Sequence, residues 1–368
     1  MSRLGTVGEF RMSDATARLR LLRTPGVGPV TFRQLLARFG SAAAAVEALP
    51  QLARRGGGAA PSVPDASVAE REQATAARIG ARYLFLGEAD YPALLAELDN
   101  APPALLIRGD LALTRRTAVA IVGARNASAA ACRFARQLGH DLADAGATVV
   151  SGLARGIDTA AHVGSLPSTI AVIAGGIDVV FPPENAALQD RIAQEGLLVA
   201  EMPPGTEPRA RHFPYRNRII AGLASGTVVV EAAPKSGSLI TARLAAEAGR
   251  DVMAVPGSPL DPRAQGCNLL IREGATLVQS AADVMEQLAP LDPRAVRSRV
   301  EPFGDAPPED ASDADRTRII DLLGPVPVAV DEIIRQATLA PAVVQTVLLE
   351  LELAGRLERH AGGRVSVW

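Results

Sequence analysis

The chain has 368 residues, 48% of them hydrophobic, and a formal net charge of −2. This length allows two or three domains with a large core. The balanced charge excludes a protein that binds nucleic acid through an overall basic excess, so any cationic surface must be local. Between residues 205 and 275, nine basic residues stand against six acidic ones.

Cysteine usage and hydropathy indicate the compartment. Cys132 and Cys267 form neither a disulfide framework nor a metal-ligand spacing, so we expect no metal and no cofactor. No apolar stretch suits a membrane span and no signal peptide is visible, so we expect a cytoplasmic protein without a membrane partner. The opening MSRLGTVGEFR resembles vector-derived sequence before a natural start at Met12, and residues 1–11 are left out of the fold prediction.

Residues 12–64 predict a helical domain. Its helical pattern is broken at TPGVGP, and a second helix follows at 31–39. The Gly-Val-Gly turn of such a hairpin offers its amides to a DNA phosphate, or the hairpin only packs on its neighbours; the sequence leaves both open. Residues 54–64 have the composition of a mobile Gly/Ala/Pro linker.

Residues 65–289 predict an extended Rossmann-like α/β domain. A helix at 67–80, a strand at 83–86, a short helix at 91–98 and an apolar segment at 104–107 come first. Continuously apolar runs then alternate with helical stretches, which indicates a mostly parallel, doubly wound sheet covered by helices on both faces. These runs are 119–123, 148–151, 170–174, 197–200, 228–230, 252–255 and 277–278.

Three of these strands end in glycine-bearing turns, GARNAS from Gly123, SGLARGID from Ser151 and GGID from Gly175. Ligands bind at the carboxyl ends of parallel strands, and glycine turns at helix starts accept anions. Two turns carry an arginine, Arg125 and Arg155, which indicates a polyanion or a phosphorylated ligand. Neither the dinucleotide fingerprint nor the P-loop pattern is present.

The stretch 212–242 brings aromatic, cationic and glycine-rich segments together. Its apolar run from Gly226 predicts a doubly buried strand, and the turn PKSGS opens a helix predicted at 239–249. Lys235 is the only lysine in the chain. A compact charge at an anion-binding turn explains it; the alternative is a surface lysine with no role.

Arg216 and Arg218 stand near a helix start, where cations are unfavourable unless an anion compensates. A phosphate would supply that anion, and the alternative is ion pairing with Glu231 or Glu201. Phe213 just before them suits either base stacking or core packing. We expect Phe181 to fill the core.

Asp158 and His162 lie four residues apart on a predicted helix, with Ser151 near them in sequence. A carboxylate near a helix start and an interior histidine explain both. No triad and no carboxylate pair is completed, so we expect no catalysis.

The remaining residues predict a linker and a winged-helix domain. Residues 290–312 are rich in Pro, Asp and Glu and are expected to be disordered. Residues 313–368 predict three helices and two strands joined at Gly362-Gly363. From residue 314 onward six arginines stand against seven carboxylates, and the third helix, PAVVQTVLLELELAG, has no cation. We therefore expect this domain to contact protein or to regulate, rather than to grip duplex DNA.

Four motifs in order, GARNAS, SGLARGIDTAAH, FPYRNRIIAGLASGTVVVEAAPKSGSLITA and VPGSPLDPRAQGCNLLIREGA, resemble the DNA processing protein A (DprA/Smf) family over residues 91–288. The resemblance implies a non-enzymatic protein that binds single-stranded DNA, forms a homodimer, protects the strand and helps load the RecA recombinase during natural transformation. Carried over by position, the implied DNA-binding residues are Gly123, Arg125, Arg155, Phe213, Arg216, Asn217, Arg218, Lys235, Ser236, Gly237, Ser238 and Asn268.

The main alternative is a Rossmann-like enzyme or sensor for a phosphorylated nucleotide, such as a phosphoribohydrolase. Those enzymes use a Pro-Gly-Gly-x-Gly-Thr turn followed by a catalytic glutamate, whereas Ile177-Asp178 follow Gly175-Gly176 here. A purely structural scaffold would leave the arginine-bearing turns without a role.

Overall fold

The computed structural model describes residues 6–289, 310–360 and 362–367. The chain forms two compact units. The central unit comprises Glu72–Arg297, and the terminal unit combines Met1–Arg71 with Ser298–Trp368. The two ends of the sequence therefore belong to one unit, and the α/β domain lies between them in the chain.

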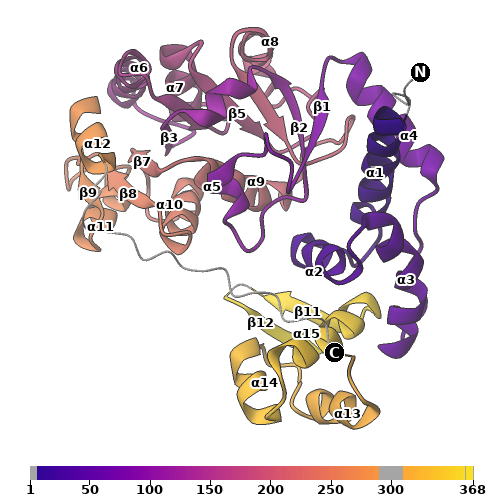
Figure 1. The fold of residues 1–368 in the computed structure, drawn as a ribbon. Coiled ribbons are helices and arrows are strands. Elements are labelled where there is room, and N and C mark those ends of the chain that lie inside the picture. The colour runs from indigo at the N-terminus through magenta and orange to yellow at the C-terminus, as the bar shows by residue number, and fades with distance from the viewer. Residues whose placement is uncertain (1–5, 290–309, 361, 368) are drawn as a thin grey trace. The chain divides into compact units, whose positions relative to one another are not determined.

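The central unit is built on one sheet, which has nine strands among the described residues in the order β1-β2-β6-β5-β4-β3-β7-β8-β9 (Figure 1). β1 and β2 pair antiparallel, β2 joins β6 antiparallel, and all further pairs are parallel. The strands are β1 (Arg82–Phe85), β2 (Ala104–Gly109), β3 (Ala118–Gly123), β4 (Thr148–Ser151), β5 (Thr169–Ile173), β6 (Leu197–Ala200), β7 (Gly226–Val230), β8 (Asp251–Ala254) and β9 (Thr276–Leu277).

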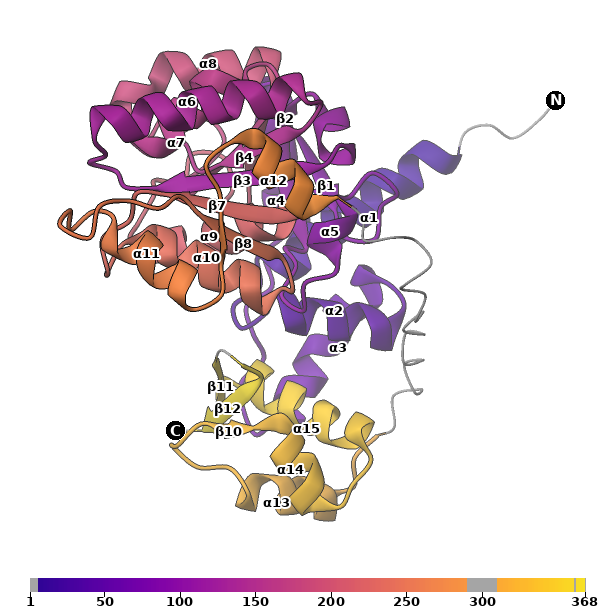
Figure 2. The same cartoon turned by 90° about the vertical axis from the view of Figure 1, so that its left-hand side faces the viewer.

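Helices cover both faces of this sheet, as the sequence predicts (Figure 2). One face packs against α5 (Ala93–Ala96), α9 (His212–Leu223), α10 (Gly237–Glu247) and α11 (Gln265–Arg272). The other packs against α4 (Ala66–Arg78), α6 (Ala129–Asp144), α7 (Ile157–Ser165), α8 (Ala186–Glu195) and α12 (Ala281–Leu288). Two short 3-10 helices, η1 (Leu111–Arg115) and η2 (Pro183–Asn185), complete the unit.

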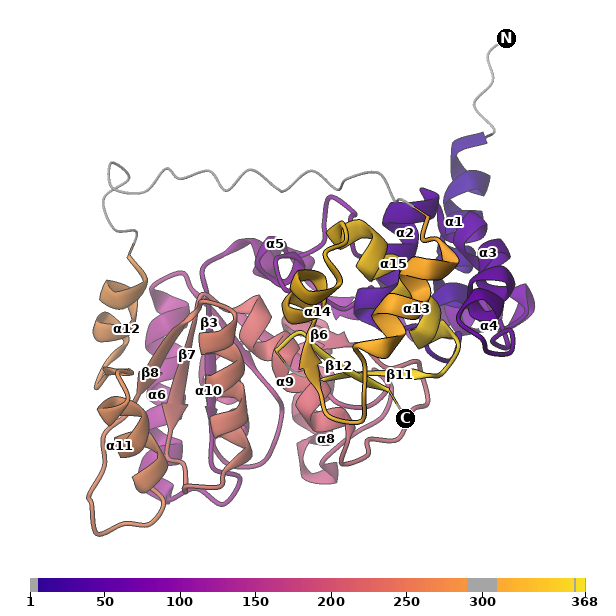
Figure 3. The ribbon, with the colours of Figure 1, turned by 90° about the horizontal axis from the view of Figure 1, so that it is seen from below.

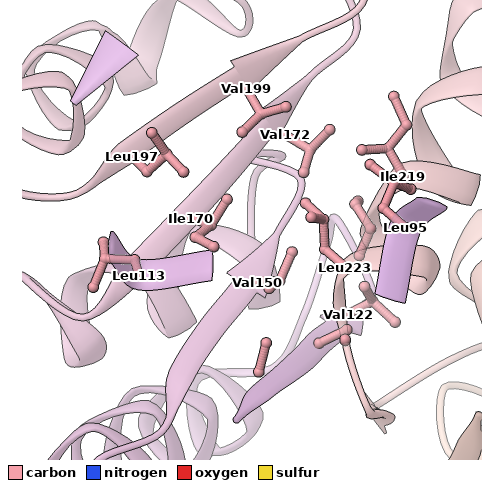
Figure 4. Packing of buried hydrophobic residues seen from close by; sticks show 14 of the residues in the cluster. Leu95, Leu113, Val122, Val150, Ile170, Val172, Leu197, Val199, Ile219 and Leu223 are labelled. Carbon is pink, nitrogen blue, oxygen red and sulfur yellow. The ribbon is translucent and has the colours of Figure 1, made fainter. Parts of the chain in front are cut away.

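The core follows from strand alternation. Val122, Val150 and Val172 point to the face that Ile219 and Leu223 of α9 cover (Figure 4). Their neighbours along each strand point to the opposite face, because successive side chains of a strand alternate. Burial on both faces explains why these strands are continuously apolar in sequence.

The topology reverses beside β3. β3 to β6 proceed outward in one direction, while β7 to β9 lie on the other side of β3. In such sheets the loops after the carboxyl ends separate at this reversal, and ligands bind there. The turns after β3, β4, β5 and β7 therefore meet at one edge.

The terminal unit combines a helical domain with the predicted winged helix (Figure 3). Its amino-terminal helices are α1 (Thr6–Leu22), α2 (Pro29–Phe39) and α3 (Ala42–Arg55). Its carboxy-terminal elements are α13 (Asp313–Asp321), β10 (Val328–Ala329), α14 (Val330–Ala337), α15 (Pro341–Leu353), β11 (Leu357–His360) and β12 (Arg364–Val367). The predicted fold class, an α/β domain with helical and winged-helix domains at the two ends, is confirmed.

The expected linker at 54–64 is wrong in its first half. Arg54 and Arg55 belong to α3, and Gly56 and Gly58 pack directly against α15. The glycines there permit close packing rather than mobility. The second expected linker lies mostly outside the described residues, but Ala311 near its end is buried in the winged-helix core.

Candidate anion-binding site

A pocket of about 240 Å³ opens at the carboxyl ends of the parallel strands. Arg125 lines it from the turn after β3, residues 152–155 from the turn after β4, and residues 173–175 from the end of β5. Phe213 and Arg216 enter from the first turns of α9. Segments that are far apart in sequence thus build a single cavity.

Arg216 is the most unusual side chain of this pocket. Only 6% of it is exposed, its Nε has no hydrogen-bond partner, and the described residues give it no ion pair. Burial lowers the pKa of Arg216 to about 10; Asp158 opposes this effect and Arg125 adds to it. The guanidinium therefore stays charged at neutral pH, although a buried charge without a bonded partner is costly. This combination is expected where a ligand supplies the missing anion.

The guanidinium lies directly against Gly152. A Cβ at position 152 would lie 1.3 Å from Nη1 of Arg216. Glycine at position 152, in the turn after β4, is thus required because Arg216 of α9 lies against it. The sequence pattern alone does not reveal this contact.

Two cations share one aromatic ring. The Cζ atoms of Arg125 and Arg216 lie 5.1 Å and 5.9 Å from the centroid of the Phe213 ring, within the range of cation–π contacts. Phe181 packs on the same ring at 5.8 Å. The expectation that Phe181 fills the core is wrong, because 46% of it is exposed at the pocket rim, where the loop after β5 places it.

Asp158 and His162 hold the turn that lines the pocket. Asp158 Oδ2 accepts from the backbone N–H groups of Gly152 (3.1 Å) and Ala154 (3.3 Å), and His162 Nε2 accepts from that of Leu153 (3.3 Å). Leu153 has a φ of 53°, a left-handed conformation that needs such support. The sequence identified both residues as structural but did not reveal that they fix this turn.

Burial sets the protonation of both groups. It raises the pKa of Asp158, against the effects of Arg216 and of the two backbone donors, and it lowers the pKa of His162 to about 3. Because Nε2 of His162 accepts a hydrogen bond, its Nδ1 carries the proton and faces Thr169 Oγ1 at 2.7 Å. Both polar ends of the imidazole are therefore occupied.

In the turn after β3, residues 123–128, the carboxylate of Glu231 already occupies the start of α6. Glu231 Oε2 accepts from the backbone N–H of Ser128 (2.7 Å), the residue that caps α6. A Cβ on Gly123 would lie 2.0 Å from the carbonyl oxygen of Val230. Gly123 is thus explained by strand packing, and Arg125 is the residue of this turn that lines the pocket.

Two further predicted contacts have structural partners instead. Arg218 is buried and donates to Glu201 Oε1 (2.5 Å) and to the Asn100 carbonyl (2.8 Å), so the ion-pair alternative holds for it. Asn268 donates to and accepts from the backbone of Gly257 at 2.9 Å and 3.1 Å. Their side chains brace the fold in this structure.

The turn after β7 offers a second candidate anion site. Lys235 is exposed, and Ser236 caps α10, whose first turn has no acidic residue. The hydroxyl groups of Ser236 and Ser238 lie 2.8 Å apart, with Gly237 between them. The positive end of the α10 dipole thus faces outward beside a lysine.

The other cations at this edge are exposed. Arg155 lies 3.8 Å from the equally exposed Glu184, a weak pairing. Asn217 is half-buried between the two arginines of α9. Arg209 and Arg211 belong to the basic excess counted at 205–275 but not to the predicted site residues, and both are exposed on the segment that leads from pocket-lining Pro208 into α9. The RARHF pattern there was the available signal.

Within the described residues no group of three His, Cys, Asp or Glu side chains could hold a metal ion. Over the same part of the chain, none of the helices has both the length and the apolar character that crossing a bilayer requires.

These features define an α/β protein whose Rossmann-like sheet carries a cationic pocket at its carboxyl edge, with a helical and a winged-helix domain at the chain ends. The family model for DNA recombination-mediator protein A matches residues 82–289, more than half of the chain. The DprA-like N-terminal HHH domain matches residues 12–75 and the DprA winged helix domain residues 304–363. The chain belongs to the DNA recombination-mediator protein A family.

Individual relatives agree. The DNA processing protein DprA of Streptococcus pneumoniae is 47% identical over 54% of this chain and 71% of its own length, and that of Bacillus subtilis is 41% identical over 62% and 76%. The S. pneumoniae structure matches with a TM-score of 0.59 at 35% identity, over 76% of this chain and 96% of that one. The Helicobacter pylori protein, whose structure describes a single-stranded DNA binding mode, matches with a TM-score of 0.52 at 30% identity, over 56% and 95%.

Proposed function

We propose that this chain is a recombination mediator that binds single-stranded DNA at the pocket and the neighbouring turns. The observation that carries the proposal is Arg216, a buried guanidinium that lines the pocket and whose Nε has no hydrogen-bond partner among the described residues. A DNA phosphate would supply its counter-anion, with Arg125 as the second cation.

The aromatic wall favours an unpaired strand. Phe213 and Phe181 form part of the pocket lining, and a base stacked on an aromatic ring contributes about 1–3 kcal/mol. A duplex keeps its bases stacked on one another, so only an unpaired strand offers one to the ring. Lys235 with the start of α10 suits a further phosphate, as do Arg209 and Arg211.

The finer activities of the proposal come from the family resemblance. They are protection of incoming DNA in the cytoplasm, help in loading RecA during natural transformation, and action as a homodimer. Two exposed leucines at one end of the sheet, Leu277 on the edge strand β9 and Leu269 on the preceding helix α11, support the proposed homodimer. These exposed apolar side chains favour packing against a second copy.

A nucleotide-processing enzyme is the competing function, and the polar groups near the pocket disfavour it. Ser151 Oγ donates to the Ile121 carbonyl at 2.6 Å, and Asp158 and His162 are held by backbone amides. None of the three is free to act as nucleophile or base, so we propose a binding role without catalysis.

Fluorescence anisotropy tests the proposal, with a labelled single-stranded oligonucleotide and the matching duplex at two salt concentrations. We expect tighter binding of the single strand. The double variant Arg216→Ala/Lys235→Ala should weaken it for all sequences and flatten the salt slope by about one to two units. Arg191→Ala, an exposed arginine paired with Glu195 on α8, is the control and should change neither quantity. Equal affinity for duplex, or displacement by a mononucleotide at similar concentration, would contradict the proposal.

A further inference from the structure

The third helix of the winged-helix domain, α15, is mainly apolar, and most of its residues are buried. Its sequence PAVVQTVLLELEL has two polar uncharged residues and two glutamates among thirteen positions. A helix whose apolar residues extend beyond one stripe packs against more than one partner. One domain of this size covers one stripe of a helix, so α15 needs a second partner.

The structure shows two stripes with different partners. Val344, Val347, Leu348 and Leu351 belong to the winged-helix core with α13 and α14. Leu349 and Leu353 belong instead to the core of the amino-terminal helices, where they join residues of α2 and α3 such as Leu35 and Leu52. Figure 2 shows α15 between α2–α3 and α13–α14.

Polar contacts follow the second stripe. Gln345 Oε1 accepts from Gln34 Nε2 at 2.9 Å, and Thr346 Oγ1 accepts from Arg38 Nη1 at 3.2 Å. Positions 345, 346, 349, 350, 353 and 354 recur at the helical period of 3.6 residues and therefore form one face. This face, defined as the α15 outer stripe, meets the amino-terminal helices along its length.

The glycines after α3 fit closely against this stripe. A Cβ on Gly56 would lie 2.0 Å from the Glu350 carbonyl oxygen, and one on Gly58 would lie 2.6 Å from the backbone of Ala354. Arg356 Nη1 donates to the Gly56 carbonyl at 3.1 Å. The run of glycines that resembles a linker in sequence is thus a packing surface for α15.

A buried carboxylate joins the two domains. Glu350 is 1% exposed and receives two hydrogen bonds from Arg316 of α13, at 2.8 Å and 3.0 Å. Arg55 of α3 lies 4.0 Å from the same carboxylate and donates to Asp310 at 3.0 Å. Arg38 of α2 also lies 3.6 Å from Asp310, so the amino-terminal helices contribute two cations to a network whose carboxylates and Arg316 belong to the winged-helix side.

We propose that the amino-terminal helical domain is the resident partner of the winged-helix domain and that the two act as a single interlocked body. In helix-turn-helix folds the second helix of the pair enters the major groove of duplex DNA, and α15 has that position after α14. Here α2 and α3 cover the outer stripe of α15. The helix therefore holds the amino-terminal and winged-helix domains together and does not read DNA. The inference does not depend on single-strand binding by the central unit.

The test uses the full chain with a specific protease site inserted between residues 300 and 301. After cleavage, size-exclusion chromatography at micromolar concentration should show the carboxy-terminal fragment eluting with the rest of the chain. Gly58→Val, which changes no residue of the winged helix, should release the fragment, as should Leu349→Asp. Gly28→Val is the matched control, because a Cβ there meets no atom within 4 Å, and it should leave the fragments together.

Circular dichroism of the released fragment separates loss of the contact from loss of folding. A fragment that keeps its helical signal after release by Gly58→Val supports the interlock. The proposal would be overturned if the two fragments separated after cleavage of the chain without either substitution. It would also be overturned if the fragments still eluted together in both Gly58→Val and Leu349→Asp.

Discussion

The pocket buries the charged side chain of Arg216, and the contact between α15 and the amino-terminal helices buries that of Glu350. The partners of these two charges distinguish a binding site from a structural contact. Glu350 is held by two hydrogen bonds from Arg316, with Arg55 nearby. Arg216 is nearly as buried, yet among the described residues its Nε has no hydrogen-bond partner, and Asp158 attracts its charge without forming an ion pair while Arg125 repels it. The fold gives the first charge two direct hydrogen bonds, whereas the second has an Nε that no described residue bonds and that a ligand could meet.

The same comparison applies to two residues of one helix. Arg216 and Arg218 are two positions apart, so about 200° of rotation separates them on α9. Arg218 reaches Glu201 and a backbone carbonyl, while Arg216 reaches the pocket. The two arginines therefore serve different partners, although they are chemically identical and only two positions apart.

The largest effect is expected at the structural charge. Glu350→Ala removes the bidentate carboxylate of Arg316 and leaves it with the longer contacts to Asp310 and Asp313, which should cost about 2–3 kcal/mol of the stability of the terminal unit. Urea unfolding followed by circular dichroism measures this cost, and single-strand affinity of the central unit should not change. Glu358→Ala, an exposed carboxylate on β11, is the control. Equal losses in the two variants would show that the Glu350 network contributes nothing.

The next effect distinguishes the two arginines of α9. Arg216→Ala should lower single-strand affinity by about 10- to 100-fold, the range of a hydrogen bond to a charged group, without lowering the melting temperature. Arg218→Ala should lower the melting temperature and leave the affinity of the folded protein unchanged, because its charge is used by Glu201. Anisotropy titration measures the affinity and thermal unfolding the melting temperature of both variants. A loss of stability in Arg216→Ala with a loss of affinity in Arg218→Ala would refute the roles given to the two arginines.

Much of the fold follows from sequence because buried parallel strands have a distinctive pattern. The valine-rich runs at β3, β4 and β7 and the glycine turns after them are all where the pattern predicts. The parallel topology then requires those turns to meet at one edge, which is why Arg125 and Arg216 could be placed in one candidate site.

Tertiary contacts that no local pattern encodes account for the errors. Glu231 fills the start of α6 from another strand, and Asn268 is used by Gly257. The glycines at 56–58 have linker composition, but their lack of side chains serves packing on α15. Two signals were available: the separation of Arg216 and Arg218 by about 200° on α9, and the apolar residues on more than one side of α15.

A smaller effect is expected from the turn that positions Arg216. In Gly152→Ala the new Cβ would occupy the place of Nη1, so the guanidinium must move from its position. Single-strand affinity should fall by about 10-fold, because one charge-assisted hydrogen bond loses its geometry. Anisotropy measures the change; Gly324→Ala, where an added Cβ meets no atom within 4 Å, should behave as wild type. Unchanged affinity in Gly152→Ala would mean that the position of this guanidinium is unimportant.

The smallest effect concerns the pH dependence of the same turn. The folded-state pKa of His162 is lowered from 6.5 to about 3, so its contribution to stability is full above pH 6.5 and is lost as the pH falls toward 3. The pKa of Asp158 is raised, which acts in the opposite sense: its contribution is present at low pH and lost as the pH rises. Replacing His162 with Gln keeps a polar group and removes only the first effect. Between pH 6.5 and pH 4.5 the melting temperature of wild type should therefore fall more steeply than that of His162→Gln. Parallel curves would mean that protonation of His162 does not limit the stability of the turn that fixes Arg216 in the pocket.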